Sequence, residues 1–141
     1  MTRIDFYLTS GSGRADKGLA VCRLSNKAFR LGHQVYILTA SPEESAQLDR
    51  LLWTFSAGSF IPHGMNTADR ETKLPVIIGN DEPPEICHDV LISLTVVIPS
   101  CFSRFERVAD IVSPTKEAKE RARERFRFYR ERGYPLQTHD L

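Results

Sequence analysis

The chain has little cysteine and histidine, and neither is spaced as a metal or catalytic site requires. Its 141 residues include three cysteines and four histidines. The cysteines are Cys22, Cys87 and Cys101, and the histidines are His33, His63, His88 and His139. The cysteines have no C-x-x-C spacing and the histidines no i, i+4 spacing, so the sequence predicts neither a disulfide framework nor a zinc site. We expect buried structural thiols, hydrogen-bonded or solvated histidines and no metal.

Long hydrophobic runs are absent as well. No segment approaches the roughly 18 apolar residues that span a bilayer, and the first residues, Met1 to Phe6, lack the apolar region of a secretory signal. No G-x-S-x-G nucleophile motif is present either. We therefore expect a cytoplasmic protein with no cofactor and no catalytic group of its own.

The formal net charge of +1 is distributed unevenly. Residues 116–132 hold eight Lys or Arg and four Glu, a net charge of +4, which leaves −3 for the remainder of the chain. A duplex-DNA-binding protein usually presents a broader basic surface. One basic segment in a nearly neutral chain favours a local acidic partner and argues against direct nucleic-acid binding through this segment.

Short apolar segments alternate with segments of helical periodicity. Strands are predicted at 4–8, 35–38, 76–78, 90–94 and 108–112, and helices at 15–31, 42–53 and 114–132, with a short helix at 101–106. Ser41 and Glu44 form a capping-box pattern, and we expect Ser113 and Pro114 to open the last helix. Residues 56–74 have little periodicity and predict a long exposed connection. The alternation predicts one domain over residues 1–141, a three-layer α/β/α sandwich with a mainly parallel sheet.

The loop from Gly11 to Gly18 follows the first strand and precedes a helix, where phosphate-binding loops occur in α/β proteins. Asp16 stands where a third glycine would complete G-x-G-x-x-G, and Lys17-Gly18 reverses the usual Gly-Lys order. A plain turn is the favoured interpretation. A nucleotide-dependent α/β enzyme that uses this loop remains the alternative hypothesis.

The last predicted helix is polarised across its width. At 100° per residue, one stripe faces the core, a second flank is basic and the opposite flank is acidic. The core stripe consists of Ala118, Ala122, Arg125, Phe126 and Tyr129. The basic flank consists of Lys116, Lys119, Arg123, Arg127 and Arg130. The acidic flank consists of Glu117, Glu120, Glu124 and Glu131. Segregated charges leave the basic flank free for an acidic peptide, although a solvated face is the competing interpretation.

A second candidate surface contains the only tryptophan, Trp53, at the end of the predicted second helix. Phe60 and Pro62 follow in the predicted connection. Aromatic residues at a helix end and in a loop can anchor an interface. Core packing is an equally good interpretation of these residues.

The same segments resemble the DNA polymerase III chi subunit family. The resemblance is carried by residues 6–8, 52–53, 59–63, 89–94 and 122–126, with Tyr129, Arg130 and Gly133. It implies a Rossmann-like fold without nucleotide chemistry, and two protein partners. These are the psi subunit of the clamp-loader complex and the acidic, apolar-ended C-terminal tail of the single-stranded-DNA-binding protein. A helicase is a further candidate partner at the psi surface, and neither membrane binding nor sequence-specific nucleic-acid contact is implied.

The resemblance also assigns residues to each surface. The implied tail site consists of Val112, Lys119, Arg123, Phe126 and Arg127, with Arg123 as the carboxylate clamp. The implied psi-facing surface consists of Trp53, Phe60 and Pro62. Phe126 departs from the family, which commonly has tyrosine at this position, so a hydroxyl contact would be absent there.

Overall fold

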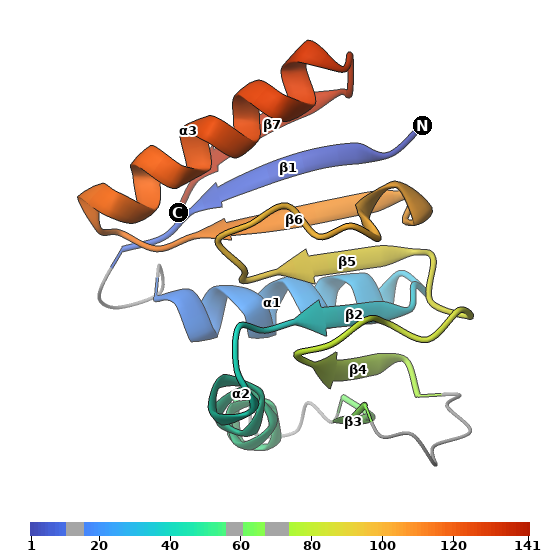
Figure 1. Cartoon of the computed structure of the whole chain (residues 1–141). Coiled ribbons are helices and arrows are strands. Elements are labelled where there is room, and N and C mark those ends of the chain that lie inside the picture. Colours follow the sequence, from blue (N-terminus) through green and yellow to red (C-terminus); the bar gives the residue numbers. More distant parts are fainter. Residues whose placement is uncertain (11–15, 56–60, 67–73) are drawn as a thin grey trace.

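A computed structural model describes residues 1–10, 16–55, 61–66 and 74–141 (Figure 1). In these ranges one seven-stranded sheet has the order β3-β4-β2-β5-β6-β1-β7. Its strands are β1 (Arg3–Leu8), β2 (Val35–Leu38), β3 (His63–Met65), β4 (Val76–Gly79), β5 (Val90–Ser93), β6 (Arg107–Val112) and β7 (Leu136–Asp140). Every neighbouring pair is parallel. The predicted parallel sheet is confirmed.

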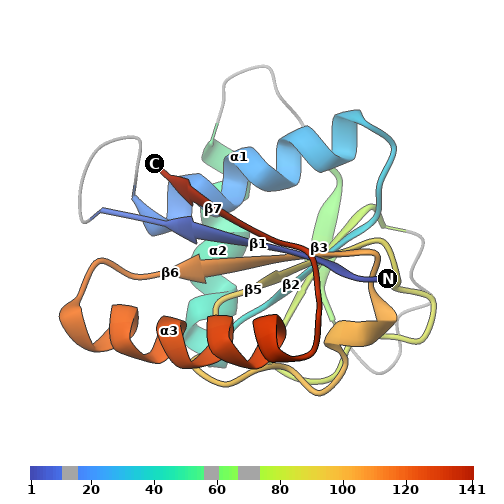
Figure 2. The ribbon, with the colours of Figure 1, turned by 90° about the horizontal axis from the view of Figure 1, so that it is seen from above.

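Helices cover both faces of the sheet. They are α1 (Lys17–Arg30), α2 (Pro42–Thr54) and α3 (Lys116–Glu131), with a short 3-10 helix, η2 (Phe102–Arg104). Figure 2 shows α1 and α3 on opposite faces, and α2 packs with α1 because Leu48 and Leu52 share a core cluster with Val21. The three-layer α/β/α sandwich is therefore confirmed.

Strand alternation divides the core into two parts. Tyr7, Ile37 and Ile92 face α1 and α2, whereas Phe6 and Tyr36 face the α3 side. Consecutive residues of a strand point to opposite faces. Strands buried on both faces read as continuous apolar runs, which is why the sequence predicted the central strands so closely.

Side-chain caps fix the beginning of each main helix. The Ser41 hydroxyl oxygen accepts a hydrogen bond from the Glu44 backbone N–H at 3.2 Å, and Glu44 accepts one from the Ala40 N–H at 2.9 Å. Thr115 caps α3 by accepting from the Ala118 N–H at 3.1 Å. The predicted opening at Ser113 and Pro114 was therefore wrong, because the threonine hydroxyl satisfies the first free N–H groups. Gly133, at φ 78°, ends α3 as expected.

Two strands were not predicted. β3 lies within the predicted connection 56–74, and its residues His63 and Gly64 are buried, so this part of the connection is not exposed. β7 follows α3 and pairs with β1. β3 is only three residues long, and β7 is largely polar. Neither strand has an apolar pattern in its sequence, and each forms beside a neighbouring strand. The helix predicted at 101–106 is reduced to the 3-10 turn.

Candidate functional site

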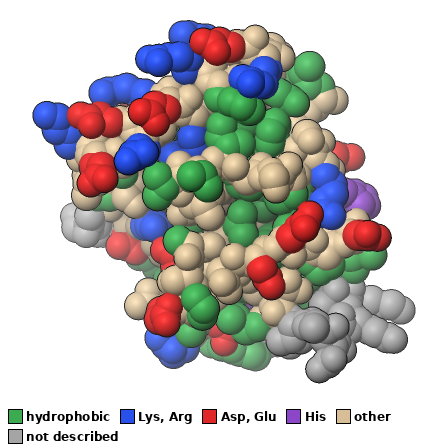
Figure 3. All heavy atoms as spheres, in the orientation of Figure 1, with side chains coloured by type: hydrophobic (Ala, Val, Ile, Leu, Met, Phe, Trp, Pro, Cys, Tyr) green, Lys and Arg blue, Asp and Glu red, His purple; other side chains and the backbone are tan. Residues whose placement is uncertain are grey.

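Helix α3 presents the faces that its sequence predicted. Ala122, Arg125 and Tyr129 are buried, and Ala118 and Phe126 are partly buried. All five residues of the basic flank are exposed. Within the described ranges, none of the five forms a salt bridge. Lys and Arg side chains gather over α3 in Figure 3. The basic flank is therefore available to an external anion.

A buried ion pair fixes α3 to the sheet. Arg125 donates from Nε and Nη2 to the two carboxylate oxygens of Asp110 on β6, each at 2.8 Å. Its Nη1 donates to the Val96 carbonyl, also at 2.8 Å. Burial raises the pKa of Asp110, and the hydrogen bonds from Arg125 oppose that rise. The bidentate geometry sets both the position and the rotation of α3 over β6.

A groove of about 200 Å³ runs between α3 and the β1–β7 end of the sheet. Helix α3 contributes Lys119, Ala122, Arg123 and Phe126, and the strands contribute Phe6, Leu8 and Thr138. The Phe6 and Phe126 rings lie 5.5 Å apart, centroid to centroid. The groove thus combines an apolar wall with two cations at its rim.

The structure brings together three of the five residues assigned to the tail site. Lys119, Arg123 and Phe126 line the groove. Val112 is buried at the end of β6 and lines a neighbouring hollow beside the first turn of α3. Arg127 is exposed on α3 and does not line the groove.

Sequence reasoning missed the strand side of this groove. Phe6 and Leu8 lie in a predicted strand, but the sequence does not say which helix covers that strand. Thr138 belongs to β7, which was not predicted, and it lies opposite Phe6 in the β1–β7 register. The period of two in a strand would have assigned Phe6 and Leu8 to one face, which is the only signal available.

The second candidate surface lies at the opposite end of the sheet. Trp53, at the end of α2, is 57% exposed, and its ring lies 4.7 Å from the His63 ring. His63 is buried, with Nδ1 2.6 Å from the Ile61 carbonyl. Pro62 is partly buried, and Phe60 lies outside the described residues. The exposure of Trp53 favours the interface interpretation over core packing for that residue.

The described end of the glycine-rich loop does not favour nucleotide binding. Residues 11–15 lie outside the described ranges. Asp16 caps α1, its carboxylate accepting from the Gly18 and Leu19 N–H groups at 3.0 and 3.3 Å. Lys17 pairs with Glu44 at 3.1 Å. A carboxylate thus occupies the helix N-terminus that a phosphate would need, and the nearby lysine is already paired.

Two further features of the described residues bear on the class of protein. No helix among them is long and apolar enough to cross a membrane. No cluster of three or more His, Cys, Asp or Glu side chains among them has the arrangement of a metal site.

The fold and the α3 groove define a Rossmann-like α/β/α protein with a groove that suits a partner both anionic and apolar. The chain belongs to the DNA polymerase III chi subunit family, because the family described as "DNA polymerase III chi subunit, HolC" matches residues 1–137. The resemblance stated from the sequence is confirmed.

Two curated relatives agree with this assignment over nearly their full lengths. The "DNA polymerase III subunit chi" of Pseudomonas aeruginosa is 42% identical over 141 residues, covering 100% of this chain and 98% of the relative. The protein of the same name from Escherichia coli (strain K12) is 31% identical over 144 residues, covering 98% and 97%.

The fold also resembles a solved structure that is distant in sequence. A chain in "The crystal structure of T4 UvsW" matches with a TM-score of 0.68 at 8% identity. The match covers 99% of this chain and 42% of that chain. At this identity the likeness shows the fold alone.

Proposed function

We propose that this protein is a non-catalytic accessory subunit of DNA polymerase III that acts in DNA replication in the cytoplasm. In this role it joins the clamp-loader complex, through the psi subunit, to the acidic C-terminal tail of the single-stranded-DNA-binding protein. Family membership supports the assignment to DNA polymerase III. The observation that carries the tail-binding role is the α3 groove, with an apolar wall and exposed cations along one rim.

The chemistry of the groove matches an acidic tail that ends in an apolar residue. Phe6, Ala122 and Phe126 form a wall for one apolar side chain. Arg123 lines the same groove and offers a planar fork for the terminal carboxylate, while Lys119 adds a second cation. Arg127 lies outside the groove, where it attracts acidic residues further along the tail. Val112 is buried at the end of β6, where it helps hold the edge of the site.

The psi subunit is assigned to the surface around Trp53 and Pro62, with Phe60 as a further contact. An exposed tryptophan supported by the buried His63 is a rigid anchor of the kind found at the centre of interfaces. A helicase that binds the same surface would compete with psi. In Figure 1 this surface, near α2 and β3, lies at the opposite end of the sheet from α3.

Calorimetric titration with a synthetic tail peptide tests the groove. Arg123→Ala should weaken binding at least about tenfold, or about 1.4 kcal/mol, because it removes the carboxylate clamp. Arg130→Ala is the matched control, since Arg130 is exposed on the same helix and does not line the groove. Binding should also weaken as salt is raised.

Either of two results would contradict the proposal. One is that the unmodified protein fails to bind the peptide. The other is that the two alanine variants lose affinity equally, since the groove would then have no special role. Binding of a nucleotide that raises the melting temperature would instead revive the enzyme hypothesis for the Gly11–Gly18 loop.

A further inference from the structure

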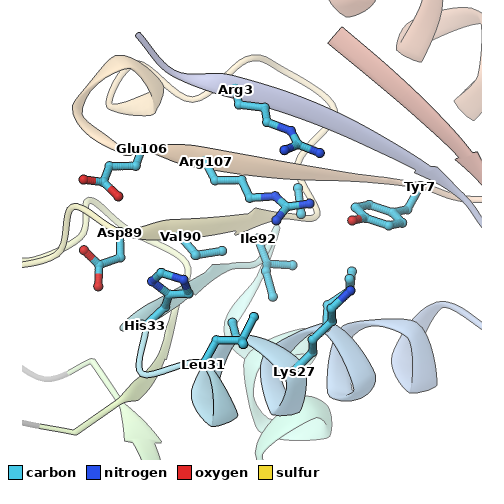
Figure 4. Close-up of a pocket in the computed structure, with 13 residues that line it drawn as sticks. Arg3, Tyr7, Lys27, Leu31, His33, Asp89, Val90, Ile92, Glu106 and Arg107 are labelled. Carbon is cyan, nitrogen blue, oxygen red and sulfur yellow. The ribbon is translucent and has the colours of Figure 1, made fainter. Parts of the chain in front are cut away.

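A second groove lies on the α1 side of the sheet, opposite the face that carries α3. Its volume is about 240 Å³, and it is bounded by α1 and by strands β1, β5 and β6 (Figure 4). None of its lining residues lines the α3 groove.

The floor of this groove is aliphatic. Val90 and Ile92 of β5 and Leu24 of α1 line it, and Leu31 borders it at the end of α1. Leu31 is 65% exposed. Binding is favoured when an apolar side chain of a ligand is buried against such a floor, because apolar surface is then removed from water.

One end of the groove is cationic. Arg107 and Arg3 converge on the fully buried carboxylate of Asp5, which lies 2.9 Å from the Arg107 Nε and 3.4 Å from the Arg3 Nε. Lys27 approaches from α1 on the other side (Figure 4). Within the described ranges Lys27 has no salt-bridge partner. Three cations against one buried carboxylate leave this end with an excess positive charge.

The other end is anionic. Glu106 and Asp89 lie together in Figure 4, on the side of the groove away from Lys27 and Tyr7. Asp89 is held in place by the Gln34 N–H, which donates to Oδ2 at 2.9 Å, and its Oδ1 lies 3.3 Å from the His88 Nδ1. Glu106 is exposed, and no described residue pairs with its side chain. The groove thus separates its charges along its length.

We propose that this groove binds a linear peptide segment of a partner protein that presents an acidic group, an apolar side chain and a basic group in that order. Lys27 and Arg107 receive the acidic group, the floor formed by Val90 and Ile92 takes the apolar side chain, and Glu106 with Asp89 receives the basic group. Charge complementarity fixes both the orientation and the register of the peptide. A single-stranded nucleic acid fits less well, because its phosphates would run past the two carboxylates.

Three short capped peptides test this proposal by two-dimensional amide NMR on the full chain. The matched probe is acetyl-Asp-Leu-Leu-Lys-amide, and the two comparison probes carry Asp at both ends or Lys at both ends. The matched probe should bind with a Kd on the order of 1 mM and shift the amides of Ala28, Val90 and Arg107. Each comparison probe should bind at least about fivefold more weakly, because one of its ends meets a like charge.

Charge reversal in the protein provides the sharper test. Lys27→Glu should weaken the matched probe about tenfold and remove most of its advantage over the peptide with two lysines, because two cations then face two carboxylates at that end. Glu106→Lys should likewise remove most of the matched probe's advantage over the peptide with two aspartates, because a cation then lies beside Asp89. The control is Arg30→Glu, the same reversal of charge on the same helix at an exposed position outside the groove, which should leave all three affinities unaltered.

Several outcomes would overturn the proposal. These are an absence of shifts at peptide concentrations of about 10 mM, shifts that map outside the groove, or charge-reversed variants with unaltered preference. Tighter binding of oligothymidylate than of the matched peptide at these amides would assign the groove to nucleic acid instead. Because Arg123→Ala leaves this groove intact, failure here is distinguishable from failure of the α3 site.

Discussion

At the scale of the residue, the most consequential side chain is Arg125. Unlike the exposed Lys and Arg side chains of α3, Arg125 turns inward and donates to three acceptors, the two Asp110 oxygens and the Val96 carbonyl. A buried charge is expensive unless it is paired and hydrogen-bonded. The pair therefore adds specificity of orientation more than net stability, and through α3 it sets where Arg123 and Phe126 stand in the groove.

If the ion pair acts in this way, a double-mutant cycle on Arg125 and Asp110 should be non-additive. Arg125→Met leaves Asp110 buried without its cation and should lower the free energy of unfolding by about 3–5 kcal/mol. Asp110→Leu should lower the free energy of unfolding by a similar amount, because it leaves the Arg125 guanidinium buried without its carboxylate partner. The double variant should recover most of the loss, since an apolar pair of comparable volume needs no desolvation of charge. Urea denaturation of the four proteins measures the coupling, and losses that simply add would contradict it.

At the scale of the element, the sequence predicted the helices and strands that have a local apolar pattern. It did not predict the two strands that form only by pairing with a neighbouring strand. The buried strands and the three main helices were predicted to within a few residues, because apolar runs and helical periodicity report burial directly. β3 and β7 could not be predicted, because His63–Met65 and Leu136–Asp140 become strands only beside β4 and β1. The same limit applies to the site. The α3 side of the groove follows from a helical wheel, whereas Thr138 enters it through an unpredicted strand.

Successive side chains of β7 point to opposite faces of the sheet, which gives a prediction about this strand. Thr138 lines the α3 groove, and its neighbour Gln137 faces the opposite side, where it accepts a hydrogen bond from Arg3. Thr138→Asp should weaken tail-peptide binding several-fold, or about 1 kcal/mol for a like charge placed near the bound carboxylate. Gln137→Asp introduces the same charge one residue away and should leave tail affinity nearly unchanged. Equal effects in calorimetric titration would mean that β7 does not form this wall.

At the scale of the whole molecule, the sheet acts as a spacer between surfaces. Its order places β7 and β1, with α3, at one end and β4 and β3, near Trp53, at the other. The α1 groove occupies the opposite face from the α3 groove. A rigid parallel sheet between them keeps the surfaces apart, so that each can be occupied without displacing the ligand of another. Such an arrangement suits a tether, which raises the local concentration of one partner near another.

The spacer view predicts that the tail and psi sites are thermodynamically independent. Trp53→Ala should reduce psi binding by at least about 2 kcal/mol, as loss of an aromatic anchor does, and should leave tail-peptide affinity within about twofold. Arg123→Ala should do the reverse. Titrating the tail peptide into the protein alone and into its complex with psi should then give the same Kd. A shift of more than about fivefold between the two titrations would mean that the sheet transmits a coupling free energy between its ends, and the protein would then act as a switch between its partners rather than as a passive link.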